Sequence, residues 1–333
     1  MSEQAPSRLT FVGGTGRSGT HVLAKLLGRA KELEDIRMEA RFHCDPGGFP
    51  DLLSGETSVS DFVGRLRGFW WHRYRGGGKP PDIVPWVSLG RSPRGLHKIM
   101  SREQFETAME RFELDTLRAL VDESRGELRE ACRNLFLGLL WPIAMEAEAA
   151  GLVEMSCDNV AQADTLRRIF PEAKFVHVVR DGRDASASRV QQGRRLLHPR
   201  TRSQGLEWWD GRIRRIEREM GAVAPEQAMT VSLDLLVQSW PKRRGLKALR
   251  EFVGVPKQHR MQRYFRRKIS PSIGNLGRWR RGLSASRQER IRGEYEEILD
   301  QMELDRLTCA PLLREVYEAE EELAASGTRR RET

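Results

Sequence analysis

The sequence has few cysteines and lacks long apolar runs. Its four cysteines are widely spaced and form no C-x-x-C pair. This pattern argues against disulfides and against a zinc site, and it favours reduced thiols in a cytoplasm. No stretch approaches the length of about 18 consecutive apolar residues that a membrane-spanning helix needs. The N-terminus carries no apolar signal region, so the sequence predicts a cytoplasmic protein without a transmembrane segment.

Signatures of nucleic-acid-binding modules are also missing. The chain has no aromatic-interleaved basic repeat, zinc finger or helix-turn-helix, so no nucleic-acid partner is expected. Lys and Arg total 57 against 47 Asp and Glu, and the excess is mostly arginine, which suits contacts to phosphate, sulfate or carboxylate. A hydrophobic fraction of 39% with 31% charged residues indicates a folded globular protein rather than a disordered one.

The most informative stretch is a glycine-rich turn between an apolar strand (9–12) and an amphipathic helix. Glycine lets the backbone curl tightly and bring its N–H groups onto a ligand. The helix that follows points the positive end of its dipole at the same place. We call this turn the first anion loop, and it predicts a site for a phosphate-like anion. It consists of Gly14, Thr15, Gly16, Arg17, Ser18, Gly19, Thr20 and His21.

The loop has the glycine spacing of two common nucleotide loops but matches neither pattern in full. The pattern G-x-x-x-x-G-K-[ST] matches at Gly14 and Gly19, but Thr20 and His21 stand where Lys and Ser/Thr are required. The dinucleotide pattern G-x-G-x-x-G fits the same loop, but no acidic residue closing a clear second strand supports it. A tight turn without a ligand is the structural alternative.

A second candidate anion site follows the clearest strand signal, the largely apolar run 175–179, which is typical of a buried parallel strand. The run stops at Arg180, and residues 180–188, which we call the second anion loop, open another helix. Two anion sites at the carboxyl ends of strands in one parallel sheet predict a nucleotide with two separated phosphates.

The segment Gly16-Arg-Ser-Gly-Thr20 resembles the 5′-phosphosulfate loop of sulfotransferases that use 3′-phosphoadenosine 5′-phosphosulfate (PAPS). The chain is most similar to tyrosylprotein sulfotransferases and related bacterial enzymes, over about residues 8–43 and 152–300. In that family an arginine at the strand end, a second arginine and a later serine bind the 3′-phosphate. Arg180, Arg183 and Ser188 match them. A basic segment folds over the cofactor, and Arg278 is at the matching position.

Glu39 is the predicted general base. If 9–12 form a central strand, the chain returning from the first helix brings Glu39 to the carboxyl ends of the strands. A carboxylate there can take the proton from an acceptor hydroxyl, and the family has a glutamate in this role at about this separation. Ion pairing with Arg37 or Arg41 is the structural alternative. With Arg17 and His21, Glu39 forms the predicted catalytic set; no metal is required.

The predicted fold is a single α/β domain over 8–325, with a P-loop-like parallel sheet of about five strands flanked by helices. Residues 44–135 predict a helical insertion that shapes the acceptor site, and 270–284 predict a basic loop that covers the cofactor. The termini, 1–7 and 326–333, are predicted to be disordered. Further strands are expected at 152–155 and 229–236.

Two departures from the family pattern leave alternatives open. His21 stands where the family has a second threonine, and Met155 stands where it has a lysine that stabilises the transferring sulfuryl group. His21 or Lys98 can supply the missing donor. The alternatives are a P-loop phosphotransferase that uses ATP and magnesium, and a non-catalytic nucleotide-binding relative.

The acceptor side is less informative. The aromatic residues of this region either line an acceptor pocket or belong to the core: Trp70, Trp71, His72 and Trp86. The glycine-rich segment 75–81 is a candidate lid. The resemblance implies a hydroxyl-bearing acceptor: a peptide tyrosine, a carbohydrate or a small metabolite. The oligomeric state stays open, a homodimer included.

Overall fold

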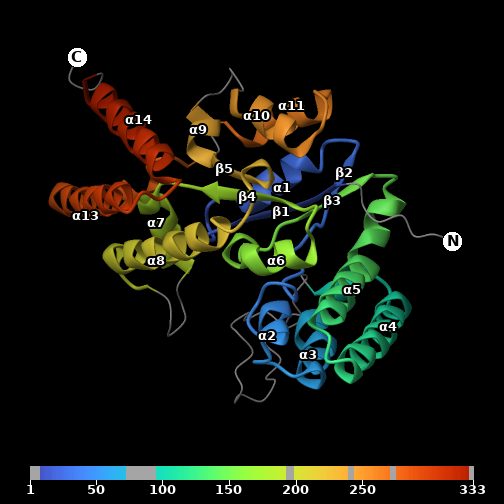
Figure 1. Ribbon diagram of the computed structural model, residues 1–333. Coiled ribbons are helices and arrows are strands. Elements are labelled where there is room, and N and C mark those ends of the chain that lie inside the picture. Colours follow the sequence, from blue (N-terminus) through green and yellow to red (C-terminus); the bar gives the residue numbers. More distant parts are fainter. Residues whose placement is uncertain (1–7, 73–94, 193–198, 239–243, 271–274, 330–333) are drawn as a thin grey trace.

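The computed structural model describes residues 8–72, 95–192, 199–238, 244–270 and 275–329. Within these residues, a parallel sheet of five strands has the order β2-β3-β1-β4-β5, which confirms the predicted α/β fold (Figure 1). The strands are β1 (Arg8–Gly14), β2 (Leu33–Asp35), β3 (Gly151–Glu154), β4 (Lys174–Val179) and β5 (Ala228–Ser232).

β1 is the central strand, and the direction of strand addition reverses beside it. After β1 the chain forms β2 and β3 on one side, then crosses to β4 and β5 on the other. The register places Val12 opposite Val176 and Gly14 opposite Val178. In open parallel sheets, ligands bind at the carboxyl ends of the strands where the order reverses. Both anion loops leave the sheet at this point, one from β1 and one from β4.

Alternating side chains of the central strands contribute to two cores. Phe11 and Phe175 pack on one face with α5 (Arg125–Glu146) and α6 (Ala163–Ile169). Val12 and Val176 pack on the opposite face, and the helices there lie above the sheet in Figure 1. They are α1 (Thr20–Leu27), α9 (Leu233–Gln238), α10 (Arg244–Val253) and α11 (His259–Lys268). Successive side chains of a strand point to opposite faces of the sheet, so a strand that is covered on both faces contributes to both cores.

A third core joins the C-terminal helices to one end of the sheet. Trp209, Trp279 and Tyr295 are its largest side chains, and all three are buried. Its helices are α7 (Gly182–Gln192), α8 (Arg202–Met220), α13 (Ala285–Leu304) and α14 (Ala310–Arg329). Helix α14 continues to Arg329, so the first four residues of the predicted disordered tail are helical. The predicted disordered residues 1–7 lie outside the described residues.

The insertion between β2 and β3 is helical in its described part, and its last helix, α5, extends past the predicted limit at residue 135. Trp70 and Trp71 are 1% and 6% exposed and pack beside Phe62 and Phe105. They therefore belong to the core. The candidate lid 75–81 and Trp86 lie outside the described residues. The other elements of the insertion are α2 (Phe49–Ser54), α3 (Val59–Arg65), the π-helix η1 (Leu66–Trp70), the 3-10 helix η2 (Leu96–Lys98) and α4 (Arg102–Val121). Two short 3-10 helices, η3 (Val160–Gln162) and η4 (Pro225–Gln227), precede α6 and β5.

Two strand predictions need correction. The strand predicted at 229–236 ends at Ser232, because α9 begins at Leu233. An acidic residue, Asp35, does close a second strand, but that strand is a short edge strand paired with β3 rather than β1. Among the described residues, no helix is long and apolar enough to span a membrane.

Candidate active site

The first anion loop curls back between β1 and α1. A Cβ at Gly14 would lie 2.4 Å from Ser18 Oγ, so the loop requires glycine there. Gly16, Arg17 and Gly19 have positive φ angles of 82°, 68° and 97°, a conformation that turns backbone N–H groups into a concave nest. No hydrogen bond within the described part of the chain uses the N–H groups of Gly16, Ser18 or Gly19. The buried Ser18 hydroxyl also lacks a partner there. These donors suit an anion.

The second anion loop starts at Arg180, which is 7% exposed. Its Nη2 donates to the carbonyl oxygen of Asn275 at 3.1 Å and lies 3.3 Å from Asp184 Oδ2. Its Nε lies 3.6 Å from Asp234 Oδ1. Burial and the neighbouring Asp181 raise the pKa of Asp184 to about 6, and burial raises the pKa of Asp234 to about 7. Since these carboxyl groups titrate near neutral pH, they offset the charge of Arg180 only in part.

The two loops meet although 171 positions separate the residues that touch. Arg17 Nε donates to Ser188 Oγ at 2.8 Å. A cavity of about 500 Å³ opens beside both loops. Its lining includes seven of the predicted site residues, namely Arg17, Gly19, Thr20, His21, Glu39, Arg180 and Arg278. Four residues of the first anion loop do not line the cavity: Gly14, Thr15, Gly16 and Ser18. Ser188 does not line it either, but its hydroxyl contacts Arg17, which does.

Glu39 is the one carboxylate in the described lining of this cavity. Its Oε1 accepts a hydrogen bond from the Cys157 thiol at 3.2 Å, and its Oε2 lies 3.4 Å from Arg41 Nη1. Arg41 is held more closely by Asp45, at 2.6 Å. The ion pair that the sequence offered as an alternative is therefore present, and Glu39 nevertheless lines the cavity.

A basic segment closes one side of the cavity. Arg278 lies in the 3-10 helix η5 (Arg278–Arg280), lines the cavity and donates to Gln191 of α7. The next residue, Trp279, donates its N–H to Asp184 Oδ1 at 2.9 Å. Burial and the nearby charge of Arg180 lower the pKa of Arg278. An anion between the two guanidinium groups would relieve this repulsion. Residues 271–274 of the predicted covering loop lie outside the described residues.

A family model described as the sulfotransferase family matches residues 10–259, well over half of the chain. The chain belongs to the sulfotransferase family. The match contains both anion loops and Glu39. It ends before Arg278, so this part of the cavity lining comes from outside the matched region, as do α13 and α14.

Solved sulfotransferase structures are similar at low sequence identity. The sulfotransferase domain of the Synechococcus PCC 7002 olefin synthase is 16% identical, with a TM-score of 0.47, over 89% of this chain and 96% of that one. The sulfotransferase domain of the curacin biosynthetic pathway is 15% identical, with a TM-score of 0.48, over 90% and 98%. A sulfotransferase from Alicyclobacillus acidocaldarius is 13% identical, with a TM-score of 0.45, over 90% and 96%. A search of curated proteins finds none that matches.

Arg183 is not brought to the cavity of this sulfotransferase. Its side chain is 0% exposed, and its guanidinium lies 2.7 Å from Asp181 and also contacts Glu320 and Glu321 of α14. It stacks over the ring of Trp279, 4.7 Å from the centre. The predicted contact of Arg183 with a 3′-phosphate therefore finds no support in its placement, because its donors are engaged within the protein.

Sequence reasoning missed a buried network beneath Glu39. Glu154, the last residue of β3, accepts the N–H of Ala40 at 2.9 Å and Nδ2 of Asn159 at 2.7 Å. Its Oε2 lies 3.1 Å from His43 Nε2. Burial opposes its ionisation, but His43 and the other donors lower the pKa of Glu154 to about 2. Since Ala40 follows Glu39, this network fixes the backbone that carries Glu39. A glutamate that closes an otherwise apolar strand was the available signal.

The structure also places the residues at which the chain departs from the family pattern. Met155 lines the cavity, at the position where the resemblance predicts a lysine. His21 lines the cavity as well, whereas Lys98 does not. Of the two candidates for the missing donor, His21 is therefore the one in position.

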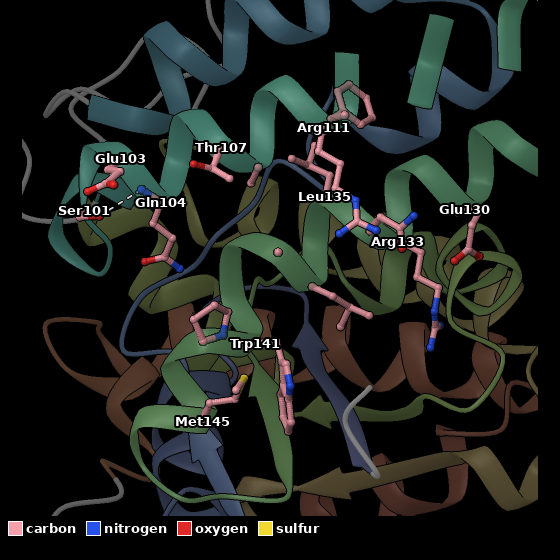
Figure 2. A pocket seen from close by; sticks show the side chains of 16 residues that line it. Ser101, Glu103, Gln104, Thr107, Arg111, Glu130, Arg133, Leu135, Trp141 and Met145 are labelled. Carbon is pink, nitrogen blue, oxygen red and sulfur yellow. Dashed lines mark hydrogen bonds between the residues drawn. The ribbon is translucent and has the colours of Figure 1, made fainter. Parts of the chain in front are cut away.

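A larger cavity, of about 880 Å³, lies in the insertion between α4 and α5 (Figure 2). Figure 2 shows Gln104 and Arg111 of α4 together with Arg133 and Trp141 of α5 around it. None of the predicted site residues lines this cavity. Size alone therefore does not mark the active site, and the smaller cavity beside the two loops remains the candidate.

Proposed function

We propose that this sulfotransferase moves a sulfuryl group from PAPS to an acceptor hydroxyl. The contact between Arg17 and Ser188 carries the proposal, because it joins the two predicted anion loops at one cavity. A single phosphate would need only one such loop. A nucleotide with phosphate groups at both ends of its ribose needs two loops close together.

The residues present suit this donor. The 5′-phosphosulfate would be held by groups that have no partner among the described residues, the N–H groups of Gly16, Ser18 and Gly19 and the Ser18 hydroxyl. Arg17, Thr20 and His21 lie beside them. Arg180, Ser188 and Arg278 would hold the 3′-phosphate. Bound PAPS would supply the sulfuryl group and leave as adenosine 3′,5′-bisphosphate.

Glu39 serves as the general base in this proposal. It is the one carboxylate in the described lining, which it shares with the cations that would hold the donor. A carboxylate there can accept the proton of an acceptor hydroxyl while Arg17, Thr20 and His21 offset negative charge on the leaving oxygen. The transfer would run in line, with acceptor and leaving oxygen on opposite sides of the sulfur. The acceptor is a hydroxyl compound whose class stays open among peptides, carbohydrates and small metabolites.

Calorimetric titration tests the donor class. We expect adenosine 3′,5′-bisphosphate to bind without added metal, and adenosine 5′-monophosphate to bind at least about tenfold more weakly, because it lacks the 3′-phosphate. Binding of ATP only in the presence of magnesium, with none of the bisphosphate, would replace this proposal by a phosphotransferase.

Glu39→Gln tests the base. General-base effects are about 10²- to 10⁴-fold, so turnover of PAPS should fall by that amount while bisphosphate affinity stays unchanged. A variant that loses binding and turnover equally would show that Glu39 is not the base. A wild-type protein that binds the bisphosphate but turns over no PAPS with peptide, carbohydrate or phenolic acceptors would favour the non-catalytic alternative, which the Met155 position suggests.

A further inference from the structure

Cys157 contacts three parts of the candidate site. Its backbone carbonyl accepts the N–H of Gly14 at 3.0 Å, where the first anion loop begins. Its Sγ lies 3.8 Å from Thr20 Oγ1, at the first residue of α1, and 3.2 Å from Glu39 Oε1. Cys157 also lines the cavity. One residue therefore connects the loop, the helix after it and the carboxylate.

The thiol is the donor in its contact with Glu39. Burial and the negative charge of Glu39 raise the pKa of Cys157 to about 12, so the sulfur keeps its proton at neutral pH. A protonated thiol is a poor nucleophile, which argues against covalent chemistry at this position. The S–H group is instead a weak donor aimed at one carboxylate oxygen.

The side chain of Glu39 needs such a partner because of where it lies. Residue 39 belongs to no helix or strand and follows the short strand β2. The N–H of Ala40 bonds to Glu154, which fixes the backbone at this point but leaves the carboxylate to be oriented by other groups. Arg41, which faces one oxygen of this carboxylate, is shared with Asp45, whereas Cys157, which contacts the other oxygen, is anchored to the first anion loop.

We propose that Cys157 is a positioning residue for the reaction: its thiol holds the Glu39 carboxylate and ties the orientation of this base to the first anion loop. The role of Glu39 rests on the proposed function, whereas the contacts of Cys157 do not. The resemblance to the sulfotransferases sets their segment Glu-Lys-Thr-Pro against Glu154-Met-Ser-Cys157 of this chain, and a proline at the last position has no side-chain donor. The contact between thiol and carboxylate therefore belongs to this chain.

The charges around the Cys157–Glu39 pair are the same in wild type, Cys157→Ala and Cys157→Ser, so differences among these three proteins isolate the thiol. Arg41 faces Glu39, and Asp158, paired with Arg212, raises the pKa of Cys157 further. The described lining of the cavity contains the cations Arg17, Arg37, Arg180, Lys268 and Arg278, together with the imidazole of His21.

Infrared spectroscopy of the S–H stretch tests the contact. The other cysteines, Cys44, Cys132 and Cys309, also absorb, so Cys157→Ser identifies the band of Cys157 by its loss. We expect Glu39→Gln to move this band to higher frequency, because an amide oxygen accepts more weakly than a carboxylate. A band that does not move in Glu39→Gln would overturn the proposal.

Titration of the Glu39 carboxylate tests the positioning effect without any acceptor. Infrared difference spectra between each protein and its own Glu39→Gln variant isolate this group. Cys157→Ala removes a donor to the charged form, so the midpoint should move up by about half a pH unit. Cys157→Ser restores a donor and should recover at least half of that shift. Equal shifts in both variants, or a shift in neither, would contradict the proposed role.

Calorimetry with adenosine 3′,5′-bisphosphate separates this proposal from the proposed function. Both cysteine variants should bind within about threefold of the wild type, since a weak hydrogen bond contributes little to affinity. A large loss in both would assign Cys157 to loop support and overturn its role as a partner of the base. If the wild type does not bind the bisphosphate, the proposed function fails while the two infrared tests still decide the contact.

Discussion

Arg180 and Arg183 stand three positions apart at the end of β4, and the protein uses them in opposite ways. Arg180 lines the cavity beside carboxyl groups whose pKa values lie near neutral pH. Arg183 is enclosed by Asp181, the α14 carboxylates and the ring of Trp279. Arg180 contributes positive charge to the cavity, whereas the charge of Arg183 is balanced by carboxylates inside the fold. Spacing in a motif therefore predicts the turn but not which arginine lines the cavity.

The largest expected effect separates the two arginines by stability. Arg183→Met leaves Asp181 and Glu320 buried without their main cation, and breaking a buried ion pair costs about 3–5 kcal/mol. Urea unfolding should show this loss. A variant with unchanged stability and abolished bisphosphate binding would show that Arg183 binds the ligand and that the two arginines do not differ in role.

A second prediction extends the comparison to carboxylates. The pKa of Glu154 is lowered to about 2, so its ionisation stabilises the fold above the ordinary pKa of a glutamate, and this contribution disappears as the pH falls toward 2. Glu154→Gln should lower the free energy of unfolding by about 2–3 kcal/mol at neutral pH. The difference from wild type should narrow in unfolding curves recorded in increasingly acidic buffers. A difference that is constant with pH would show that packing, not charge, is responsible.

The third prediction concerns the arginine that faces the cavity. Hydrogen bonds to charged groups contribute about 1.5–3 kcal/mol, so Arg180→Ala should weaken bisphosphate binding by about 10- to 100-fold in calorimetry. Its unfolding free energy should change much less than that of Arg183→Met. The exposed Arg129 in α5 offers a control, and Arg129→Ala should change neither quantity.

The smallest effect is a dependence of binding on pH. As Asp184 and Asp234 ionise, with pKa values of about 6 and 7, negative charge appears beside Arg180 and should oppose an incoming phosphate. Asp234→Asn removes one of these charges, so the ratio of its bisphosphate affinity to that of wild type should rise by about two- to fivefold between mildly acidic and mildly alkaline buffer. Calorimetry at several pH values measures this ratio. A flat ratio would mean that Asp234 keeps its proton or is screened.

Short sequence patterns were sufficient to predict those elements whose conformation depends on residues that are neighbours in the chain. β1 and β4 were predicted because buried parallel strands are apolar runs, and the anion loops were predicted because glycine and arginine stand next to each other in sequence. β2 has only three residues at the sheet edge, which is too short for a periodic signal. The strand predicted at 229–236 was too long because its apolar run continues into α9, where packing rather than composition decides the conformation.

Residues whose partners lie far away in sequence could not be predicted in this way. Glu320, the partner of Arg183, is 137 positions away, in α14. Glu154 and His43 are likewise joined across more than a hundred positions. The apolar strand before Glu154 is a local signal that this glutamate is buried, but nothing in the local sequence identifies His43 as its partner, which follows from the tertiary fold.

The strand order also bears on how the chain folds. β1 cannot complete its pairing until β4, some 160 positions later, has been synthesised, and the contact between Arg17 and Ser188 forms later still. Contacts over such separations require large loops to close first and make folding slow. The apolar faces of β1 and α1 therefore stay exposed on the nascent chain, where aggregation competes with folding. We expect this protein to depend on chaperones during synthesis, and fragments that end before α7 to bind no nucleotide.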